Sequence, residues 1–276
     1  MVSAHSLQVT VYLYLTLHIL QLLDRFQTLL KIKKTRDNLR KDLESEWDTS
    51  IIQDFSELEL EKLYTSKQYK NVKLSFGIAS ACNFTLYHKF IENHKLHVIY
   101  YNFPELGNPP TKITKTAAQK IQSLYADEII DPEDSILMIL FAPVPENLAK
   151  EIESMYSKGQ EELKINDLSE DIYEQNESLG DLKYRKAHFK NIHIHHLDAL
   201  SLDLRYHSLV PKHEVIRDKG TIDQILEECN AKLSQLPVIL RTDPQAKLLR
   251  MAPGDICKIH RITATGGEVP YYRVCK

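Results

Sequence analysis

The sequence predicts a mixed α and β protein, of the α+β or α/β class, with two small domains. In the first half, strand-like apolar runs alternate with helical segments, which is the pattern of an α/β unit over a small sheet. Near the C-terminus, two strand-like runs flank a Gly-Gly pair, which predicts a hairpin. We therefore expect an N-terminal α/β domain over 1–157, an acidic insert or linker over 158–187, and a C-terminal mixed-sheet domain with two short helices over 188–276.

Composition narrows the class of protein. The 276 residues carry a formal net charge of −3, with 43% hydrophobic and 26% charged residues, as in an ordinary soluble globular protein. This charge argues against a protein that coats nucleic acid by itself, although it leaves room for a local basic face. The four cysteines form no C-x-x-C pair, which favours a reducing compartment over a disulfide framework or a four-thiolate zinc site.

The first thirty residues predict a helix rather than a signal peptide or membrane anchor. The apolar run from Leu7 to Leu23 lacks a basic leader, and polar residues interrupt it well short of a membrane span. Apolar residues recur at helical spacing at Leu15, Ile19, Leu22, Phe26 and Leu29. We therefore expect a packed amphipathic helix and no membrane partner. The basic stretch 31–40 is interpreted as a solvated helix face, with a nucleic-acid contact as the alternative.

The elements of the first domain follow in order. A charged helix is expected over 57–63, whereas 72–90 fits either a strand or a helix. A strand over 96–101 ends at a Pro- and Gly-rich turn, and a helix then passes through Ile121 and Leu124. The apolar run 136–141 is typical of a buried strand, and Pro143 to Glu146 begins a further helix over 147–155.

The next segment, 160–182, has eight acidic residues against one basic residue and is interpreted as exposed. Alternating apolar residues over 189–204 predict strands of the C-terminal sheet. A helix begins at Gly220-Thr221, where Thr221 and Gln224 have the spacing of a capping box.

The final forty residues predict a short helix and a hairpin. The helix begins at Thr242-Asp243-Pro244, because either of the first two residues can cap and proline fits the first helical position. Pro253-Gly254 ends it, and strands over 255–262 and 269–274 follow, joined over 265–268.

Catalytic and metal-binding motifs are weak. His193 and His195 share a strand face, but no cysteine or carboxylate stands at a supporting spacing, so surface or hydrogen-bonded histidines are expected. The E-x-K triplet of a nuclease occurs at Glu162 to Lys164, in the acidic segment, where no rigid strand is expected. Gly266-Gly267 lacks the Lys and Ser/Thr of a phosphate loop. We expect no catalytic residue, metal or cofactor.

Two C-terminal blocks resemble a known family. Residues 207–213 read His-Ser-Leu-Val-Pro-Lys-His, similar to the H-x-L-V-P-x-H stretch of the fifth subunit of eukaryotic DNA-directed RNA polymerases and of its archaeal counterpart. The segment from Leu236 to Val274 resembles the C-terminal assembly domain of that family, in the same order and at the same separation. More weakly, the order of strand, proline-rich turn, helix start at Lys112 to Thr116 and apolar strand resembles the family's N-terminal jaw domain.

This resemblance implies a non-catalytic structural subunit that docks on the largest polymerase subunit and contacts other subunits. It also implies that the jaw domain lies near downstream duplex DNA and binds it weakly and without sequence specificity. The implied location is the nucleus, or the cytoplasm or virion for a viral polymerase. The implied partner-binding residues are His207, Leu209, Val210, Pro211, His213, Thr242, Asp243, Pro244, Arg261, Tyr272 and Arg273. The DNA-proximal candidates are Lys112, Lys115, Lys120 and Pro145.

Some features depart from the family. The acidic segment is an addition, and Glu146 stands in a loop where its charge would repel phosphate. Pro270 lies in the last strand, which implies a sheet edge or a bulge. Local structure is the alternative interpretation of the docking residues: Pro211 as a turn, Asp243 as a cap and Tyr272 as a packed strand residue. A free-standing adaptor that reuses the assembly domain, and a metal-dependent nuclease-like enzyme, are the alternative functions.

Overall fold

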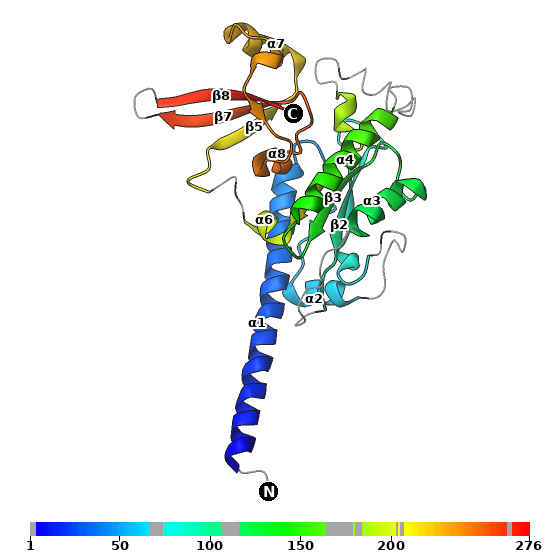
Figure 1. Cartoon of the computed structure of the whole chain (residues 1–276), viewed down its shortest axis with the longest axis vertical. Helices are drawn as coiled ribbons and strands as arrows, with labels where there is room; N and C mark the ends of the chain where they lie inside the picture. Colours follow the sequence, from blue (N-terminus) through cyan, green and yellow to red (C-terminus); the bar gives the residue numbers. More distant parts are fainter. Residues whose placement is uncertain are drawn as a thin grey trace.

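The computed structural model describes residues 4–66, 74, 76–105, 116–163, 179, 184–202, 204, 207–263 and 267–276. It contains a first sheet in the order β1-β2-β3-β4 and a second sheet in the order β5-β7-β8-β6. Helices lie on both sides of the first sheet, and the second sheet lies beside it (Figure 1). The predicted mixed α and β class with two sheets is confirmed.

The first sheet is mostly parallel. Its strands are β1 (Phe84–Tyr87), β2 (Lys95–Tyr101), β3 (Ser135–Leu140) and β4 (Ile192–His196). β1 pairs antiparallel with β2, and the other pairs are parallel. Parallel strands need long crossovers, which α3 (Thr116–Ala126) and α4 (Glu146–Glu162) provide. Every residue of β3 is buried, as expected for a strand covered on both faces.

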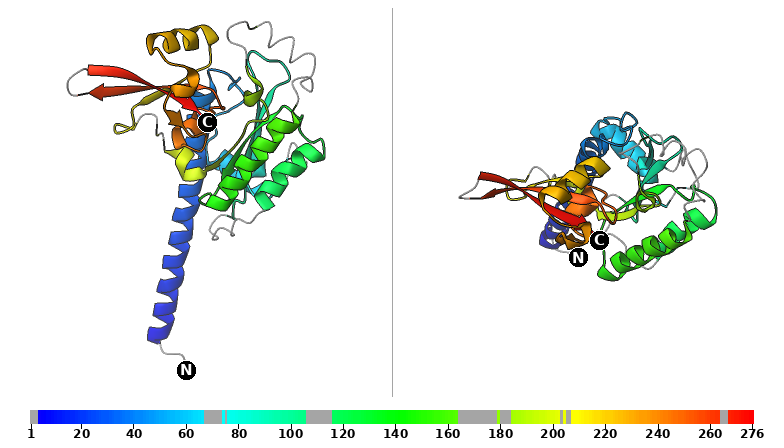
Figure 2. Two further views of the ribbon diagram at one scale, coloured as in Figure 1. Left: turned by 45° about the horizontal axis from the view of Figure 1, so that its top comes forward. Right: turned by 90° about the horizontal axis from the view of Figure 1, so that it is seen from above.

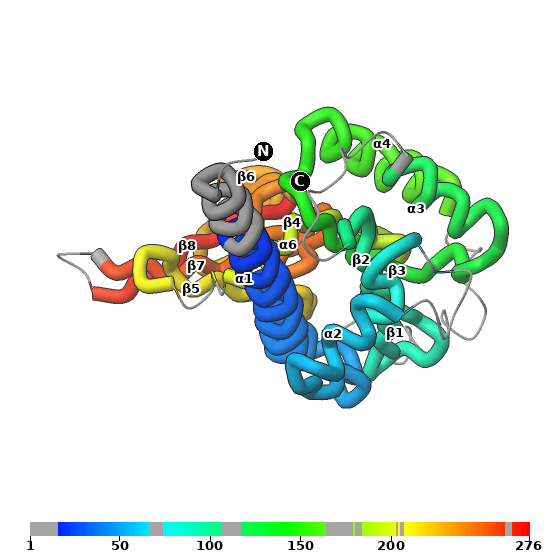
Figure 3. The backbone as a smooth tube through the Cα atoms, turned by 90° about the horizontal axis from the view of Figure 1, so that it is seen from below, coloured from blue at the N-terminus to red at the C-terminus, as the bar shows by residue number. Residues whose placement is uncertain are grey.

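Helices cover the two faces of this sheet separately. On one face, Ile99, Met138 and Ile194 pack against Ile121 of α3 and Leu148 of α4. The other face packs against α1 (Ala4–Leu43), α2 (Glu57–Thr65) and α6 (Leu197–Ser201). Figure 3 shows the sheet between these two groups of helices. The result is a three-layer arrangement of helices, sheet and helices.

Helix α1 is 40 residues long, which corresponds to about 60 Å, and only its second half packs. Leu29 and Leu39 are buried, whereas the first half projects from the body (Figures 1 and 2). Ile19, Leu22 and Phe26 are 57%, 49% and 45% exposed. The helix prediction is confirmed, but the prediction that these side chains are packed is wrong, because the helix is longer than the sheet that it covers. Among the described residues, no helix combines the length and apolar content needed to span a bilayer.

The basic stretch that follows is only partly a solvated face. Lys34 is exposed, but Arg36 is 6% exposed and donates to the carbonyl oxygen of Cys82 at 3.1 Å. The Arg36 guanidinium lies over the rings of Phe55 and Phe84, 5.0 and 4.9 Å from their centroids. Arg36 therefore stabilises the packing of α1, as a buried guanidinium with aromatic and carbonyl partners does.

The prediction that residues 189–204 form strands of the C-terminal sheet is wrong. β4 pairs with β3 in the first sheet, and α6 begins at Leu197, where a second strand was expected. Alternation reports a covered strand face but does not identify the neighbouring strand. Helix α4 also runs beyond residue 155 and ends at Glu162, inside the acidic segment. The domain boundaries at 157 and 188 stay a prediction.

The second sheet has the expected hairpin and two short helices. Its elements are β5 (Lys212–Ile216), α7 (Lys219–Glu228), β6 (Val238–Ile239), α8 (Pro244–Leu248), β7 (Ile256–Thr263) and β8 (Gly267–Cys275). The predicted capping box at Thr221 is wrong, because Asp218 caps α7 and accepts from the Thr221 backbone N–H at 2.7 Å. Asp243 caps α8 and Pro244 is its first residue, as predicted.

Pro270 lies at a sheet edge. The pairing of β7 with β8 is unbroken from Gly267 to Val274, so no bulge occurs. On its other side, β8 pairs with β6 only at Val274 and Cys275. The prediction of an edge or a bulge is therefore resolved as an edge, where proline removes no ladder hydrogen bond.

Candidate docking surface

The β7–β8 hairpin projects away from the first sheet (Figures 1 and 2). It carries exposed aromatic, apolar and basic side chains. Strand register places residues opposite one another on the same face: Ile259 pairs with both His213 and Tyr271, and Arg261 pairs with Val269. We call one face of this sheet the docking face, defined by His213, Arg261, Val269, Tyr271 and Arg273.

Two arginines flank one tyrosine on the docking face. The guanidinium carbons of Arg261 and Arg273 lie 4.8 and 5.4 Å from the centroid of the Tyr271 ring. Arg273 also donates to the Val238 carbonyl at 3.2 Å, which fixes it to β6. Tyr271 and Val269 remain 36% and 44% exposed. Exposed tyrosine with arginine is the composition typical of interface anchors.

Tyr272 lies on the opposite face. It packs against a cluster that contains Leu236, Ile256 and Val274, and burial raises the pKa of its phenol. The interpretation of Tyr272 as a packed strand residue is confirmed, and its role in partner binding stays a prediction. The same opposite face carries Ile262 near the end of the hairpin, 88% exposed.

The segment before β5 is a turn that exposes one apolar side chain. Leu209 is 85% exposed, and its backbone N–H donates to Nδ1 of His207 at 3.3 Å. His213 donates from Nδ1 to the Pro211 carbonyl at 2.6 Å. These local bonds explain the conformation around Val210 and Pro211, which are half-buried, whereas His207 and Leu209 are exposed.

The start of α8 lies apart from the hairpin end. Thr242 and Pro244 are exposed, and an Asp243 carboxylate oxygen accepts from the Gln245 backbone N–H at 2.8 Å. Ala246 joins the buried cluster with Ile259, so α8 packs on the docking face nearer to the first sheet. The structure thus brings His213, Arg261 and Arg273 together but leaves Thr242, Pro244 and Tyr272 elsewhere.

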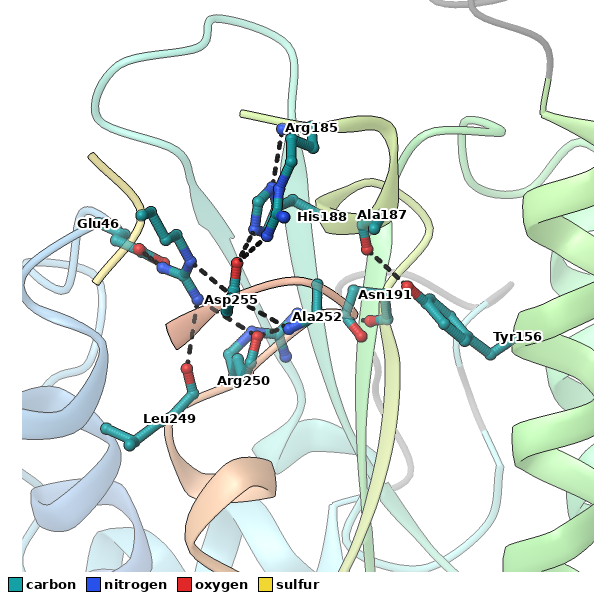
Figure 4. A network of polar contacts seen from close by, with 11 residues as sticks. Glu46, Tyr156, Arg185, Ala187, His188, Asn191, Leu249, Arg250, Ala252 and Asp255 are labelled. Atoms are coloured by element: carbon teal, nitrogen blue, oxygen red, sulfur yellow. Dashed lines mark hydrogen bonds and ion pairs between the residues drawn. The ribbon is translucent and has the colours of Figure 1, made fainter. Parts of the chain in front are cut away.

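A buried polar network holds the second sheet against the first (Figure 4). Asp255, just before β7, is fully buried and accepts from His188 Nε2 at 2.8 Å, from the Ala252 backbone N–H at 2.9 Å and from Arg217 Nε at 3.3 Å. Arg185 also donates to Asp255. The backbone N–H of Arg185 donates to His188 Nδ1 at 2.9 Å, so Nε2 carries the hydrogen that Asp255 accepts.

The charge on Asp255 is stabilised despite its burial. Burial alone would raise the pKa of this carboxyl, but His188 and Arg217 favour the ionised form, and the pKa lies below its ordinary value. Arg217 forms an ion pair with Glu46, which follows α1, and donates to the Leu249 carbonyl at 3.4 Å. The network therefore joins segments before, within and after the acidic insert.

Two further arginines, Arg241 and Arg250, extend the contact between the two sheets. Arg241 donates to Glu153 of α4 at 2.6 Å and to the Asn191 side chain at 2.8 Å, and its guanidinium lies 3.8 Å from the Tyr156 ring centroid. Asn191 donates to the Arg250 carbonyl at 3.2 Å. Burial lowers the pKa of Arg250 to about 9. Such dense bonding fixes the orientation of the second sheet and of the docking face.

Sequence reasoning missed this network. Asp255 and His188 are 67 positions apart, and no local pattern pairs them. One signal was available at Gly254, whose φ of +90° favours glycine and whose added Cβ would meet the Arg185 guanidinium. Tyr271 was also missed, although period-two alternation along β8 places it on one face with Val269 and Arg273.

The predicted DNA-proximal residues are only partly described. Lys120 is exposed on α3, with its Nζ 6.0 Å from the Phe76 ring centroid, and Lys112 and Lys115 lie outside the described residues. Pro145 is the N-cap of α4. The Glu146 beside it forms an ion pair with Lys150 at 2.7 Å, which offsets part of its negative charge.

The histidines differ from the expectation. His193 and His195 share a strand face, as predicted, with ring centroids 6.3 Å apart. The expectation of surface side chains is wrong for them, because they are 1% and 6% exposed, and neither Nε2 has a hydrogen-bond partner among the described residues. Their strand lies in the covered first sheet, which buries them. Within the described ranges, no three His, Cys, Asp or Glu side chains converge to hold a metal ion.

Comparison with known proteins gives the class of the C-terminal region. The family model described as RNA polymerase Rpb5, C-terminal domain, matches residues 202–275. The chain is 47% identical over 68 residues to the DNA-directed RNA polymerase subunit Rpo5 of Methanococcus maripaludis, covering 25% of this chain and 86% of that protein. It is 46% identical over 74 residues to Rpo5 of Sulfurisphaera tokodaii, covering 27% of this chain and 87% of that protein. It is 41% identical over 75 residues to Rpo5 of Archaeoglobus fulgidus, covering 27% of this chain and 97% of that protein.

The matched range contains the whole second sheet and all the predicted partner-binding residues. These similarities define a subunit of a DNA-directed RNA polymerase. The chain belongs to the Rpb5 and Rpo5 family, the fifth polymerase subunit, as its C-terminal motifs predicted. The jaw assignment of the N-terminal region lies outside the matched range and stays a prediction.

Proposed function

We propose that this chain is a non-catalytic structural subunit that docks on the largest subunit of its polymerase through the β7–β8 hairpin. The supporting observation is the docking face of that hairpin, where Val269 is 44% and Tyr271 is 36% exposed. Arg261 and Arg273 flank Tyr271 and supply donors for partner carbonyls or carboxylates. The hairpin lies within the range similar to Rpo5 subunits. Leu209, Thr242 and Pro244 would extend the contact.

The non-catalytic role is supported by the position of the nuclease-like triplet. Glu162 is the last residue of α4, its side chain is 73% exposed, and it lies 3.5 Å from Lys190 Nζ. Two-metal chemistry requires carboxylates that converge on rigid positions, and an exposed helix terminus does not provide them. For a eukaryotic host we propose a nuclear location, which family membership supports and which fluorescence microscopy of a tagged chain would test.

Co-purification tests the docking proposal. The chain, tagged and expressed in its native cells, should recover the two largest polymerase subunits in stoichiometric amounts, as judged by mass spectrometry. Val269→Asp should reduce this recovery roughly tenfold, because it places a charge on the docking face, in a contact that is desolvated on binding. Leu58→Asp is the matched control: Leu58 is 71% exposed on α2, in the first half of the chain, so recovery should be unchanged.

The possible outcomes separate the alternatives. Recovery of unrelated partners in place of polymerase would favour the free-standing adaptor. Equal recovery with both variants would refute the hairpin as the docking element while leaving membership of the polymerase intact. Divalent-metal-dependent cleavage of DNA by the purified chain would favour the nuclease-like enzyme.

The jaw proposal places Lys112, Lys115 and Lys120 near downstream duplex DNA. Changing all three to Gln should reduce the slope of log affinity against log salt by roughly 2 to 3, because each lost phosphate contact contributes about 0.9. Fluorescence anisotropy with a labelled duplex measures this slope. A control variant with the same charge change alters exposed lysines elsewhere, namely Lys62, Lys150 and Lys158. Equal slopes for the two triple variants would refute a specific role for the first set.

A further inference from the structure

A cavity of about 210 Å³ opens where the first sheet meets the second. It lies at the carboxyl ends of the parallel strands β3 and β4, bordered by Val144 after β3 and by His195 near the end of β4. The opposite wall comes from the second half of the chain, with Lys247 and Leu248 at the end of α8. Ligands of α/β proteins commonly bind at the carboxyl ends of parallel strands, and here the second sheet, rather than a reversal of strand order, completes the walls of the cavity.

The walls are mostly apolar and carry one charge. Val144, Ile194 and Leu248 supply apolar surface, and Lys247 is the only charged side chain among the lining residues that the structure describes. In the described part of the chain, Lys247 forms no ion pair. Burial lowers its pKa from 10.5, so the surroundings leave the ammonium only partly compensated.

A buried imidazole adds a second polar group. His195 lines the cavity, and its Nε2 has no hydrogen-bond partner among the described residues. Burial lowers its pKa to about 3, so the ring is neutral at pH 7 and adds no charge to the cavity wall. That Nε2 atom is itself fully buried, so the imidazole forms part of the cavity wall and offers no exposed donor to a ligand.

We propose that this cavity binds a small monocarboxylic acid with an apolar body. The carboxylate would neutralise the Lys247 ammonium, while the body would lie among Val144, Ile194 and Leu248. The size fits, because a cavity of about 150 Å³ holds benzene, and the additional volume accommodates a short carboxylate arm. No acidic residue lines the cavity within the described ranges, and the carboxylate that acts on Lys247, that of Glu153, lies outside the lining.

This proposal is independent of polymerase docking. Thr242 lines the cavity and is also a predicted partner-binding residue, so ligand and partner would be neighbours in the assembled enzyme. Binding is nevertheless measured on the free, full-length chain. Failure to recover polymerase subunits would therefore not bear on it, and absence of ligand binding would not bear on docking.

Three matched probes test the chemistry by isothermal titration calorimetry. 3-Phenylpropionate, 3-phenylpropan-1-ol and 3-phenylpropylamine share one apolar body and differ in charge. The carboxylate should bind about tenfold more tightly than the alcohol, the factor expected for one additional charge-assisted bond, and the amine should bind most weakly. Equal affinities for the three probes, or no binding of the carboxylate, would overturn the proposal.

Two variants locate the binding. Lys247→Met keeps an apolar stem and removes the charge, so the carboxylate should lose about tenfold in affinity while the alcohol is unaffected. Ala199→Phe places a ring in the cavity wall and should abolish binding of both probes. Lys150→Met, at a lysine that is 76% exposed on α4, is the matched control and should change neither affinity. Carboxylate binding that is unchanged in Lys247→Met would place the ligand elsewhere and overturn the assignment.

Discussion

Replacing Asp255 with Asn tests whether the polar network stabilises the contact between the two sheets. The change keeps the shape of the side chain and removes its charge, leaving Arg217 and His188 with a poorer acceptor. Breaking a buried ion pair by removing one partner costs about 3–5 kcal/mol. Arg217 keeps its ion pair with Glu46, and Arg185 is 41% exposed and can turn to solvent. We therefore expect the lower end of that range, about 3 kcal/mol.

Urea unfolding followed by circular dichroism measures this loss as a decrease in the free energy of unfolding at pH 7. The matched control is Asp218→Asn, the same chemical change at an exposed N-cap, where Asn caps as well as Asp and the free energy should change by less than about 0.5 kcal/mol. A loss at Asp255 as small as that at Asp218 would refute the stabilising role of the network.

The pH dependence provides a second test at Asp255. The pKa of this carboxyl is lower in the folded state than its ordinary value of 3.8. Its stabilising contribution is therefore complete above pH 3.8 and is lost as the pH falls through the folded-state pKa. The difference between wild type and Asp255→Asn should be constant from pH 7 to about pH 4 and decrease below that. A difference that grew on acidification would contradict this sign.

Three further predictions concern single positions. Gly254→Ala should destabilise the chain by about 1–3 kcal/mol in urea unfolding, because φ is +90° and the new Cβ would meet Arg185. Hydrogen bonds to Glu214 and Glu268 raise the pKa of His260 above 6.5, so NMR titration should find a raised pKa in the wild type and a lower pKa in Glu268→Gln. The stability that these bonds contribute is present below pH 6.5 and is lost as the pH rises through the folded-state pKa of His260. Asp243→Ala should cost about 1 kcal/mol of stability through the lost N-cap, read as a lower melting temperature.

Each of these has a control. Gly77→Ala has a similar φ of +103° with no atom near the new Cβ, so a smaller loss there isolates the contact of Gly254 with Arg185. Glu57→Gln, at an exposed position on α2, should leave the pKa of His260 unchanged. Asp243→Asn should retain the cap, and an unchanged melting temperature in Asp243→Ala would show that the cap contributes little.

Local chemistry made most elements predictable. Pro244 at the first position of α8 and Asp243 before it follow from which groups satisfy a helix N-terminus. The β3 strand follows from an unbroken apolar run, which a sheet covered on both faces requires. The cap of α7 was misplaced by three residues, because Asp218 and Thr221 are both good caps and only the backbone decides between them.

The sequence by itself determined the hairpin, the two short helices of the second sheet and, through two blocks of motif, the polymerase family, because each depends on residues close together in the chain. Only the tertiary structure decided that β4 joins the first sheet, that α1 extends past its packing partners, and that Asp255 binds His188 and Arg217 across 67 and 38 positions. The cavity beside Lys247 is likewise formed by segments distant in sequence. Residue propensity and apolar periodicity predict the local backbone conformation and which face of an element is buried. Pairing between distant segments depends on how the buried faces of different elements fit together in space.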